Sequence, residues 1–182
     1  MAALNRESLL QNEQFEREAM SHVDALVGVA RRLTRNFSDA EDIVQETYLR
    51  AWKYFHSFET GSNCKAWLFR IMFNVINLRE GKKMKLAEET LEDDDPRRYE
   101  AGNVLAFDPL RQLEGRELME ATGLLSEEYR SVLWLVVVED FSYKEAAEIL
   151  SVPIGTVMSR LHRARRDLRK IMMSRRARGI SN

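Results

Sequence analysis

The basic side chains in the last third of the chain could bind phosphate groups. Between positions 160 and 178 they are Arg160, Arg163, Arg165, Arg166, Arg169, Lys170, Arg175, Arg176 and Arg178, and Asp167 is the single acid. A helix that faces only water mixes both signs of charge, whereas a helix that follows a nucleic-acid backbone carries mainly positive charge. The asymmetry therefore favours contact with DNA over a merely solvated helical hairpin.

The residues around this stretch predict a helix, a tight turn and a second helix. Ser142 to Glu145 reads as a capping box that begins the first helix. Pro153 and Gly155 are expected to mark the turn. The second helix carries an inward stripe at positions i, i+4, i+7 and i+11, formed by Val157, Leu161, Ala164 and Leu168. This pattern is typical of a helix-turn-helix unit, whose second helix offers its N-terminal half to the DNA major groove.

The composition is typical of a soluble globular protein and argues against several functions. The chain has 182 residues, 45% hydrophobic and 31% charged, with a net charge of −1. The single cysteine, Cys64, excludes an internal disulfide, and with only three histidines it argues against a zinc site. No apolar run reaches membrane-spanning length and the N-terminus lacks the pattern of a signal peptide, so we expect a cytoplasmic protein without membrane insertion.

The sequence also predicts that the chain is not an enzyme. It contains no nucleophile–base pair, no metal-ligating cluster and no glycine-rich phosphate loop. We therefore expect no catalytic residue, no metal and no cofactor.

Three helices are predicted in the first half of the chain, over residues 15–35, 38–56 and 65–86. The second begins with the capping box Ser38 to Glu41. Its predicted inward-facing residues are Ala40, Ile43, Val44, Thr47, Tyr48, Ala51, Trp52 and Phe55. Opposite them lies a strip formed by Asp42, Gln45, Glu46, Leu49 and Lys53. A solvated face is the ordinary interpretation, but a leucine among carboxylates and an amide is typical of a polar protein interface.

Aromatic and polar side chains alternate in and before the third predicted helix. The aromatic residues are Phe58, Trp67, Phe69 and Phe73, and their polar neighbours include Lys65, Arg70, Asn74 and Asn77. Aromatic residues at helical spacing usually belong to a core, which is expected for Trp67. Phe69 and Phe73, in contrast, are predicted to lie off the core stripe, which is formed by Leu68, Ile71, Met72, Val75 and Ile76. Exposed rings that stack on bases, beside cations that hold phosphates, would suit single-stranded DNA.

Two helical domains are predicted. Residues 1–13 are expected to be an N-terminal tail, 14–86 the first domain, 87–107 a flexible acidic linker and 108–178 the second domain. Strand signals are few, and the apolar run 132–138 is interpreted as a buried central helix of the second domain. The predicted fold class is all-α.

Three blocks of the sequence, in this order, resemble the extracytoplasmic-function sigma factors of bacterial RNA polymerase. They are DAEDIVQETYLRAWKYFHSF, KAWLFRIMFNVINLREGKK and FSYKEAAEILSVPIGTVMSRLHRARRDLR. The resemblance spans about residues 15–170 and implies a sigma-2-like helical bundle and a sigma-4-like helix-turn-helix domain. It further implies a chain that binds core RNA polymerase, directs it to specific promoters and helps to melt the −10 element. The string GTVMSRLHR is similar to a redox- or stress-responsive subgroup.

The resemblance implies a role for each matched residue. The residues expected to dock on the β′ clamp helices of core polymerase are Asp39, Glu41, Asp42, Gln45, Glu46 and Leu49. Those expected to capture and contact the melted −10 element are Phe58, Gly61, Ser62, Asn63, Lys65, Arg70, Phe73, Asn74 and Asn77. Those expected to contact the −35 element are Thr156, Met158, Ser159, Arg160, His162, Arg163 and Arg166.

The partners implied are core RNA polymerase, through its β′ clamp helices and β flap, promoter DNA and an anti-sigma factor. One alternative function is a helix-turn-helix regulator that binds duplex DNA without polymerase. Such a regulator would have no use for the strip around Leu49 or for Phe58 and Asn74.

Overall fold

The computed structural model describes most of the chain as helix. Its described residues are 2–34, 36–79, 81 and 115–177, with side chains described for 9–34, 36–79, 81 and 119–175. They belong to two compact units, one before and one after the boundary between residues 85 and 86. No strand occurs among these residues, which confirms the all-α prediction. The predicted acidic linker 87–107 and the predicted start of the second domain at 108–114 lie outside the described residues.

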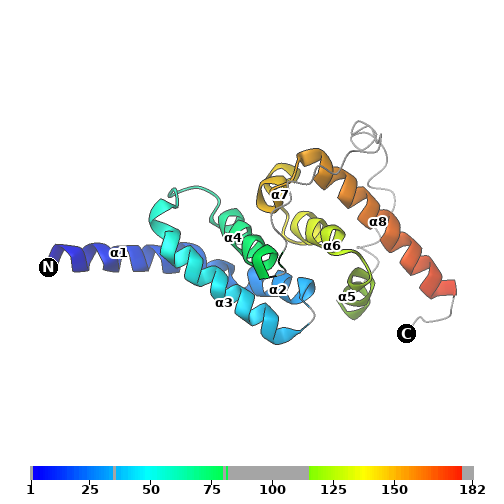
Figure 1. Cartoon of the computed structure of the whole chain (residues 1–182), viewed down its shortest axis with the longest axis horizontal. Helices are drawn as coiled ribbons and strands as arrows, with labels where there is room; N and C mark the ends of the chain where they lie inside the picture. The colour runs from blue at the N-terminus through cyan, green and yellow to red at the C-terminus, as the bar shows by residue number, and fades with distance from the viewer. Residues whose placement is uncertain (1, 35, 80, 82–114, 178–182) are drawn as a thin grey trace. The chain divides into compact units, whose positions relative to one another are not determined.

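The first unit is built from four α-helices and two 3₁₀ turns (Figure 1). Their bounds are α1 (Ala2–Ala19), η1 (Met20–His22), α2 (Val23–Leu33), α3 (Phe37–Tyr54), η2 (Phe55–Ser57) and α4 (Cys64–Arg79). Helix α3 packs against both α2 and α4, and α4 also contacts α1. Residues 2–13, predicted as a tail, are therefore helical in this structure.

The prediction of a single helix over residues 15–35 is wrong, because the 3₁₀ turn η1 separates α1 from α2. Ala19, the last residue of α1, is fully buried. The hydroxyl of Tyr48 on α3 donates a hydrogen bond to the Ala19 carbonyl oxygen at 2.9 Å. A carbonyl at a helix end needs such a partner, because it has lost its partner within the helix. The break is thus stabilised by a residue 29 positions away, which local periodicity does not reveal.

Helix α3 begins at a different cap from the one predicted. Asn36, not Ser38, is the N-cap: its side-chain oxygen accepts a hydrogen bond from the Asp39 backbone N–H at 2.7 Å. Its amide group also donates to the Asp39 carboxylate at 2.7 Å. Ser38 lies one residue inside the helix, where it cannot cap. Predicted inward residues of α3 are buried, among them Ile43, Val44 and Ala51.

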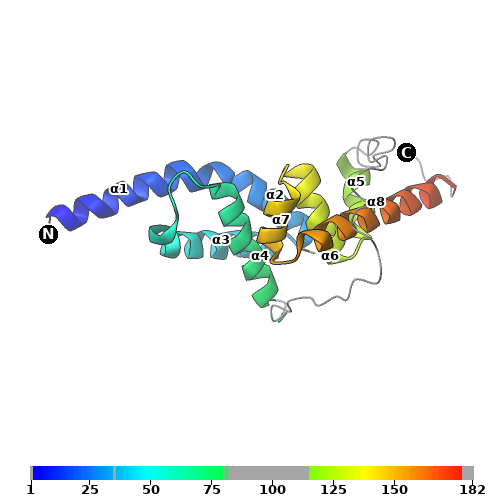
Figure 2. The same cartoon turned by 90° about the horizontal axis from the view of Figure 1, so that it is seen from above.

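Helix α4 is buried over a wider face than its sequence suggested. The predicted stripe residues Leu68, Met72 and Val75 are buried, and so are Phe69 and Phe73, the latter with only 4% of its surface exposed. The prediction of an exposed aromatic surface at Phe69 and Phe73 is therefore wrong. The physical reason is that α4 contacts both α3 and α1, and Figure 2 shows it lying across α3. The part of the predicted helix beyond residue 81 lies outside the described residues.

The second unit contains α5 (Gly115–Gly123), α6 (Glu127–Leu133), the π-helical turn η5 (Trp134–Val138), α7 (Tyr143–Leu150) and α8 (Ile154–Ala177). Residues Val132 to Leu135 are almost fully buried, as predicted for the central helix. The rest of the predicted run is not, because Val136 and Val137 are half-buried and Val138 is 38% exposed. Helices α5, α6 and α7 all pack against α8, and Figure 1 shows α6 running beside it.

The helix-turn-helix unit is formed by α7 and α8. The capping box is present in full: the Ser142 hydroxyl accepts from the Glu145 N–H, and the Glu145 carboxylate accepts from the Ser142 N–H at 2.9 Å. Between the helices Ser151 adopts the left-handed conformation, with φ of 55°. Gly155, predicted to mark the turn, lies instead in the first turn of α8. The inward stripe of α8 is confirmed, since Val157, Leu161, Ala164 and Leu168 are all buried.

Candidate functional site

The predicted DNA-reading residues of α8 divide into two groups. Thr156 and Ser159 are buried, and the Ser159 hydroxyl donates to the Thr156 carbonyl oxygen at 3.1 Å. Because both side chains are buried in this conformation, the structure does not support their contact with DNA, which stays a prediction. The remaining residues are half-buried or exposed: Met158, Arg160, His162, Arg163 and Arg166. We call this group the outer face of α8.

The outer face of α8 is held in place by the second unit. Helix α7 packs against α8, and the buried stripe fixes the rotation of α8 about its axis. Near its C-terminal end, Arg175 of α8 lies 3.2 Å from the carboxylate of Glu120 on α5. Helix α8 thus presents a row of cations on a scaffold that three other helices support, as a major-groove helix requires.

Most of the six α3 residues that the resemblance assigns to polymerase docking are exposed. Asp39, Glu41, Asp42 and Gln45 are exposed, and Leu49 leaves 59% of its surface to solvent. Glu46 is half-buried and pairs with Arg50 at 2.6 Å. Because the buried residues of α3 face α2 and α4, this polar strip faces away from the core. We call these six residues the α3 strip.

A hollow of about 370 Å³ lies beside the α3 strip. It is lined by Glu46, Leu49, Arg50, Lys53 and Tyr54. Sequence analysis did not include Arg50 and Tyr54. Their signal was present, because Arg50 is four residues from Glu46 and Tyr54 is four residues from Arg50, a spacing that shares a helix face. An exposed leucine and a tyrosine in a shallow hollow ringed by charges are suited to a protein contact.

The loop between α3 and α4 combines a buried start with an exposed middle. Phe58 is 9% exposed and stacks on Phe55, with ring centroids 5.6 Å apart and an interplanar angle of 12°. Gly61 and Ser62 are exposed, and Gly61 has φ of 90°, which only glycine adopts readily. Asn63, also exposed, accepts a hydrogen bond from the Ala66 N–H at 3.0 Å and so caps α4.

The predicted −10 residues of α4 lie on its solvent side. Arg70 is exposed, and Lys65, Asn74 and Asn77 are half-buried. We call these four residues, together with the loop 59–63, the −10 face. The rings of Phe58 and Phe73 are buried beneath it. Contact of either ring with a base therefore stays a prediction. In this conformation both rings belong to the hydrophobic core.

Burial shifts the pKa of three groups near the start of α4. It raises the pKa of the Cys64 thiol to about 11, and the negative charge of Glu18 acts in the same direction. It raises the pKa of Tyr48 to about 12, with a further contribution from Cys64. Burial, with the positive charge of Lys65, lowers the pKa of His22. Cys64 is thus a protonated, buried thiol at neutral pH, the opposite of a reactive cysteine.

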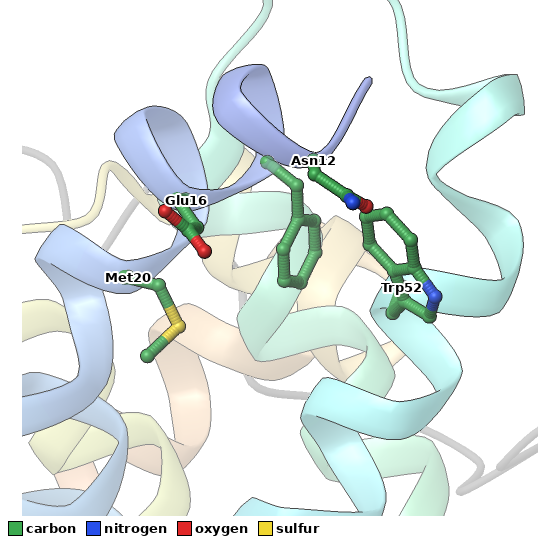
Figure 3. Close-up of a pocket in the computed structure, with 5 residues that line it drawn as sticks. Asn12, Glu16, Met20 and Trp52 are labelled. Carbon is green, nitrogen blue, oxygen red and sulfur yellow. The ribbon is translucent and has the colours of Figure 1, made fainter. Parts of the chain in front are cut away.

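A second hollow, of about 530 Å³, lies between α1 and α3 (Figure 3). It is lined by Asn12, Phe15, Glu16, Met20 and Trp52. Figure 3 shows Asn12 and Trp52 on one side of it and Glu16 and Met20 on the other. Trp52, predicted to be inward-facing, is 40% exposed here, because it lines this open hollow; the ring of Phe15 lies edge-on to it at a centroid distance of 5.1 Å.

Neither a metal site nor a membrane span is found in the part of the chain that the structure describes. No three acidic, histidine or cysteine side chains in that part converge as a metal site would require. No helix there is both long and apolar enough to cross a bilayer.

Comparison with known families identifies the two units. Residues 19–79 match the family described as sigma-70 region 2, and residues 115–168 match sigma-70, region 4. The first range covers η1 to α4, and the second covers α5 and most of the remaining unit. Together they define a sigma-70-type transcription initiation factor.

Individual relatives show which group of sigma-70-type factors the chain resembles. The chain is 34% identical over 154 residues to the ECF RNA polymerase sigma factor SigW of Bacillus subtilis, covering 81% of this chain and 82% of that one. It is 33% identical over 154 residues to the ECF sigma factor SigE of Mycolicibacterium smegmatis, covering 81% of this chain and 57% of that protein's length. The sigma factor RpoE of Bartonella quintana, solved with the anti-sigma factor NepR, matches with a TM-score of 0.67 and 30% identity, covering 88% of this chain and 98% of that one. This chain belongs to the extracytoplasmic-function sigma factors of RNA polymerase, and the alternative of a free-standing regulator is not favoured.

Proposed function

We propose that this sigma factor docks on core RNA polymerase through the α3 strip. The observation that carries the proposal is Leu49, an apolar side chain that is 59% exposed among carboxylates and an amide. An interface that buries one leucine and pairs its acidic neighbours with basic residues gains both affinity and orientation. The partner surface is the β′ clamp helices, and the second unit contacts the β flap.

The −10 face binds the non-template strand once the promoter opens. Arg70 and Lys65 supply charge for the phosphates, while Asn74 and Asn77 offer both hydrogen-bond donors and acceptors to unstacked bases. The exposed loop 59–63 receives a base that has left the stack. Unpairing costs a few kcal/mol, and these contacts offset that cost.

The outer face of α8 contacts the −35 duplex in the major groove. Arg160, Arg163 and Arg166 give salt-dependent affinity through phosphates, and His162 lies among them where base edges can be reached. Met158 offers only an apolar contact, so it discriminates thymine methyl groups rather than hydrogen-bonding patterns. The first unit thereby reads the −10 element and the second unit reads the −35 element.

The chain itself carries out no catalytic step in this scheme. Sigma factors are non-enzymatic initiation factors, and the polymerase performs the chemistry of RNA synthesis. This protein therefore acts in the cytoplasm, where the polymerase is. An anti-sigma factor holds it inactive, a proposal supported by the similarity to RpoE of Bartonella quintana, which was solved in such a complex.

The test is run-off transcription with purified core polymerase on a library of promoter sequences. The expected result is initiation that requires this chain, from promoters that share −35 and −10 elements. A mobility shift with and without core polymerase accompanies it, and we expect specific binding only with core polymerase. Tight, specific duplex binding by the free chain, without stimulation of transcription, would instead establish the regulator.

A further inference from the structure

We propose that Gln14 of α1 is a positioning residue for the −10 face: it holds the exposed loop 59–63 in the conformation that receives a base. The proposal rests on the proposed function of that loop. Gln14 lies before residues 19–79, the segment that matches sigma-70 region 2. Nothing in the resemblance assigned a role to it. The argument comes from how the loop is attached to the rest of the first unit.

The two ends of the loop are fixed by packing and by a helix cap. At its start Phe58 lies against Phe55 and Trp67, with ring centroids 5.6 Å and 5.0 Å away. At its end the side chain of Asn63 caps α4. Both anchors are local, because they tie the loop only to the helices that it connects.

The middle of the loop has little to hold it. Residues 59–62 are all exposed, and the backbone makes one internal turn bond, from the Ser62 N–H to the Glu59 carbonyl oxygen at 3.0 Å. A side chain built at Gly61 would meet no atom within 4 Å, so no neighbour packs on that point. A glycine in open space has wide conformational freedom. Ordering this segment in solution therefore needs a contact from outside it.

Gln14 supplies that contact. Its side-chain amide donates to the Thr60 hydroxyl oxygen at 2.9 Å, across 46 residues of sequence. The same amide nitrogen donates to the carboxylate of Glu18, one helical turn along α1, at 3.1 Å. The Glu18 contact selects one orientation of the amide, so that its second N–H is directed at Thr60. The loop is thereby linked to a helix that makes no part of the −10 face.

The same stretch of α1 also supports the aromatic anchor of the loop. Phe15, next to Gln14, places its ring edge-on to Phe55 at a centroid distance of 5.1 Å. Phe55 in turn stacks on Phe58. One turn of α1 therefore fixes the loop both at its buried start and at its exposed middle. A loop held before DNA arrives loses less conformational entropy on binding than one that must order at that moment.

The experiment uses the full-length chain assembled with core polymerase on a promoter obtained from the run-off selection. The variants are Gln14→Ala, Thr60→Val and the double variant. Thr60→Ser serves as the conservative variant, because it keeps the accepting hydroxyl. The matched control is Gln11→Ala, which removes the same amide from the half-buried position one turn earlier on α1. The probe is the single-stranded non-template −10 oligonucleotide of that promoter.

We expect Gln14→Ala and Thr60→Val each to weaken probe binding about three- to ten-fold, the effect of losing one hydrogen bond. The double variant should be no worse than either single variant, because both remove the same contact. Thr60→Ser and Gln11→Ala should bind as the unchanged chain does. Affinity for core polymerase and binding of duplex −35 DNA should not change in any variant.

Three results would overturn the inference. Unchanged probe binding by Gln14→Ala shows that the loop does not need α1. Additive losses in the double variant show that Gln14 and Thr60 act separately, for example by touching DNA directly. A loss of core affinity equal to the loss of probe affinity shows a general structural defect. If the unchanged chain binds no probe even with core polymerase, the proposed function fails instead, so the two failures are distinguishable.

Discussion

Truncation of Leu49 is the sharpest test of the α3 strip. Leu49→Ala removes most of an apolar side chain that is 59% exposed, while leaving the helix backbone and all carboxylates in place. An exposed substitution of this kind changes folding stability by no more than about 0.5 kcal/mol. Any large effect must then come from a surface that the side chain meets in a complex.

The size of that effect follows from the area still open to solvent. Full burial of a leucine side chain contributes about 1.5–3 kcal/mol. Since somewhat over half of the Leu49 surface remains to be buried, docking on polymerase should gain about 1–2 kcal/mol from it. Truncation to alanine should therefore raise the Kd for core polymerase by roughly 5- to 30-fold.

The assay is titration of labelled core polymerase with the purified chain, followed by fluorescence anisotropy. Leu10→Ala is the matched control, because Leu10 on α1 is 60% exposed and lies outside the α3 strip. We expect the control to bind as the unchanged chain does, and both variants to melt at the same temperature. Equal Kd values for Leu49→Ala and Leu10→Ala would refute the assignment of the α3 strip to polymerase.

Three further predictions concern stability. Ser142→Ala removes the capping box of α7 and should destabilise the second unit by about 1 kcal/mol, measured as a lower melting temperature. Leu161→Ala leaves a cavity beneath the outer face of α8; it should cost about 2–5 kcal/mol in urea unfolding and weaken duplex binding through loss of folded protein. Because burial raises the pKa of Cys64 from 9.0 to about 11, the folded state holds its proton longer than the unfolded state. Thermal stability should thus fall as the pH rises from about 9 to 11, and a series of melting curves should show a shallower fall for Cys64→Ala.

The features that were predictable from sequence are those set by neighbouring residues. The capping box of Ser142 and Glu145 involves residues three apart, so its pattern specifies both partners. The stripe of α8 is equally local, because one face of an isolated helix is defined by its own period. The exposure of Leu49 followed from the same argument applied to α3.

The predictions that the structure contradicts concern features that depend on residues distant in the sequence. The sequence places Phe73 on a surface because the period of a single helix indicates one buried face, whereas contact with both α1 and α3 covers more of α4. The break after Ala19 depends on the hydroxyl of Tyr48 on another helix. The cap at Asn36 was missed for a different reason: Ser38 satisfies the same rule two positions later, and local pattern does not choose between two acceptable caps.

The division of α8 into buried and outer side chains has a consequence for how such proteins diversify. Val157 and Leu161 specify the fold, whereas the half-buried Met158 and the exposed Arg166 belong to the outer face of α8. Replacing side chains of the outer face leaves the hydrophobic interior unchanged, so such substitutions cost little folding stability. Duplicated copies of this gene could therefore acquire separate sets of target genes through a few substitutions, each of which leaves the protein folded.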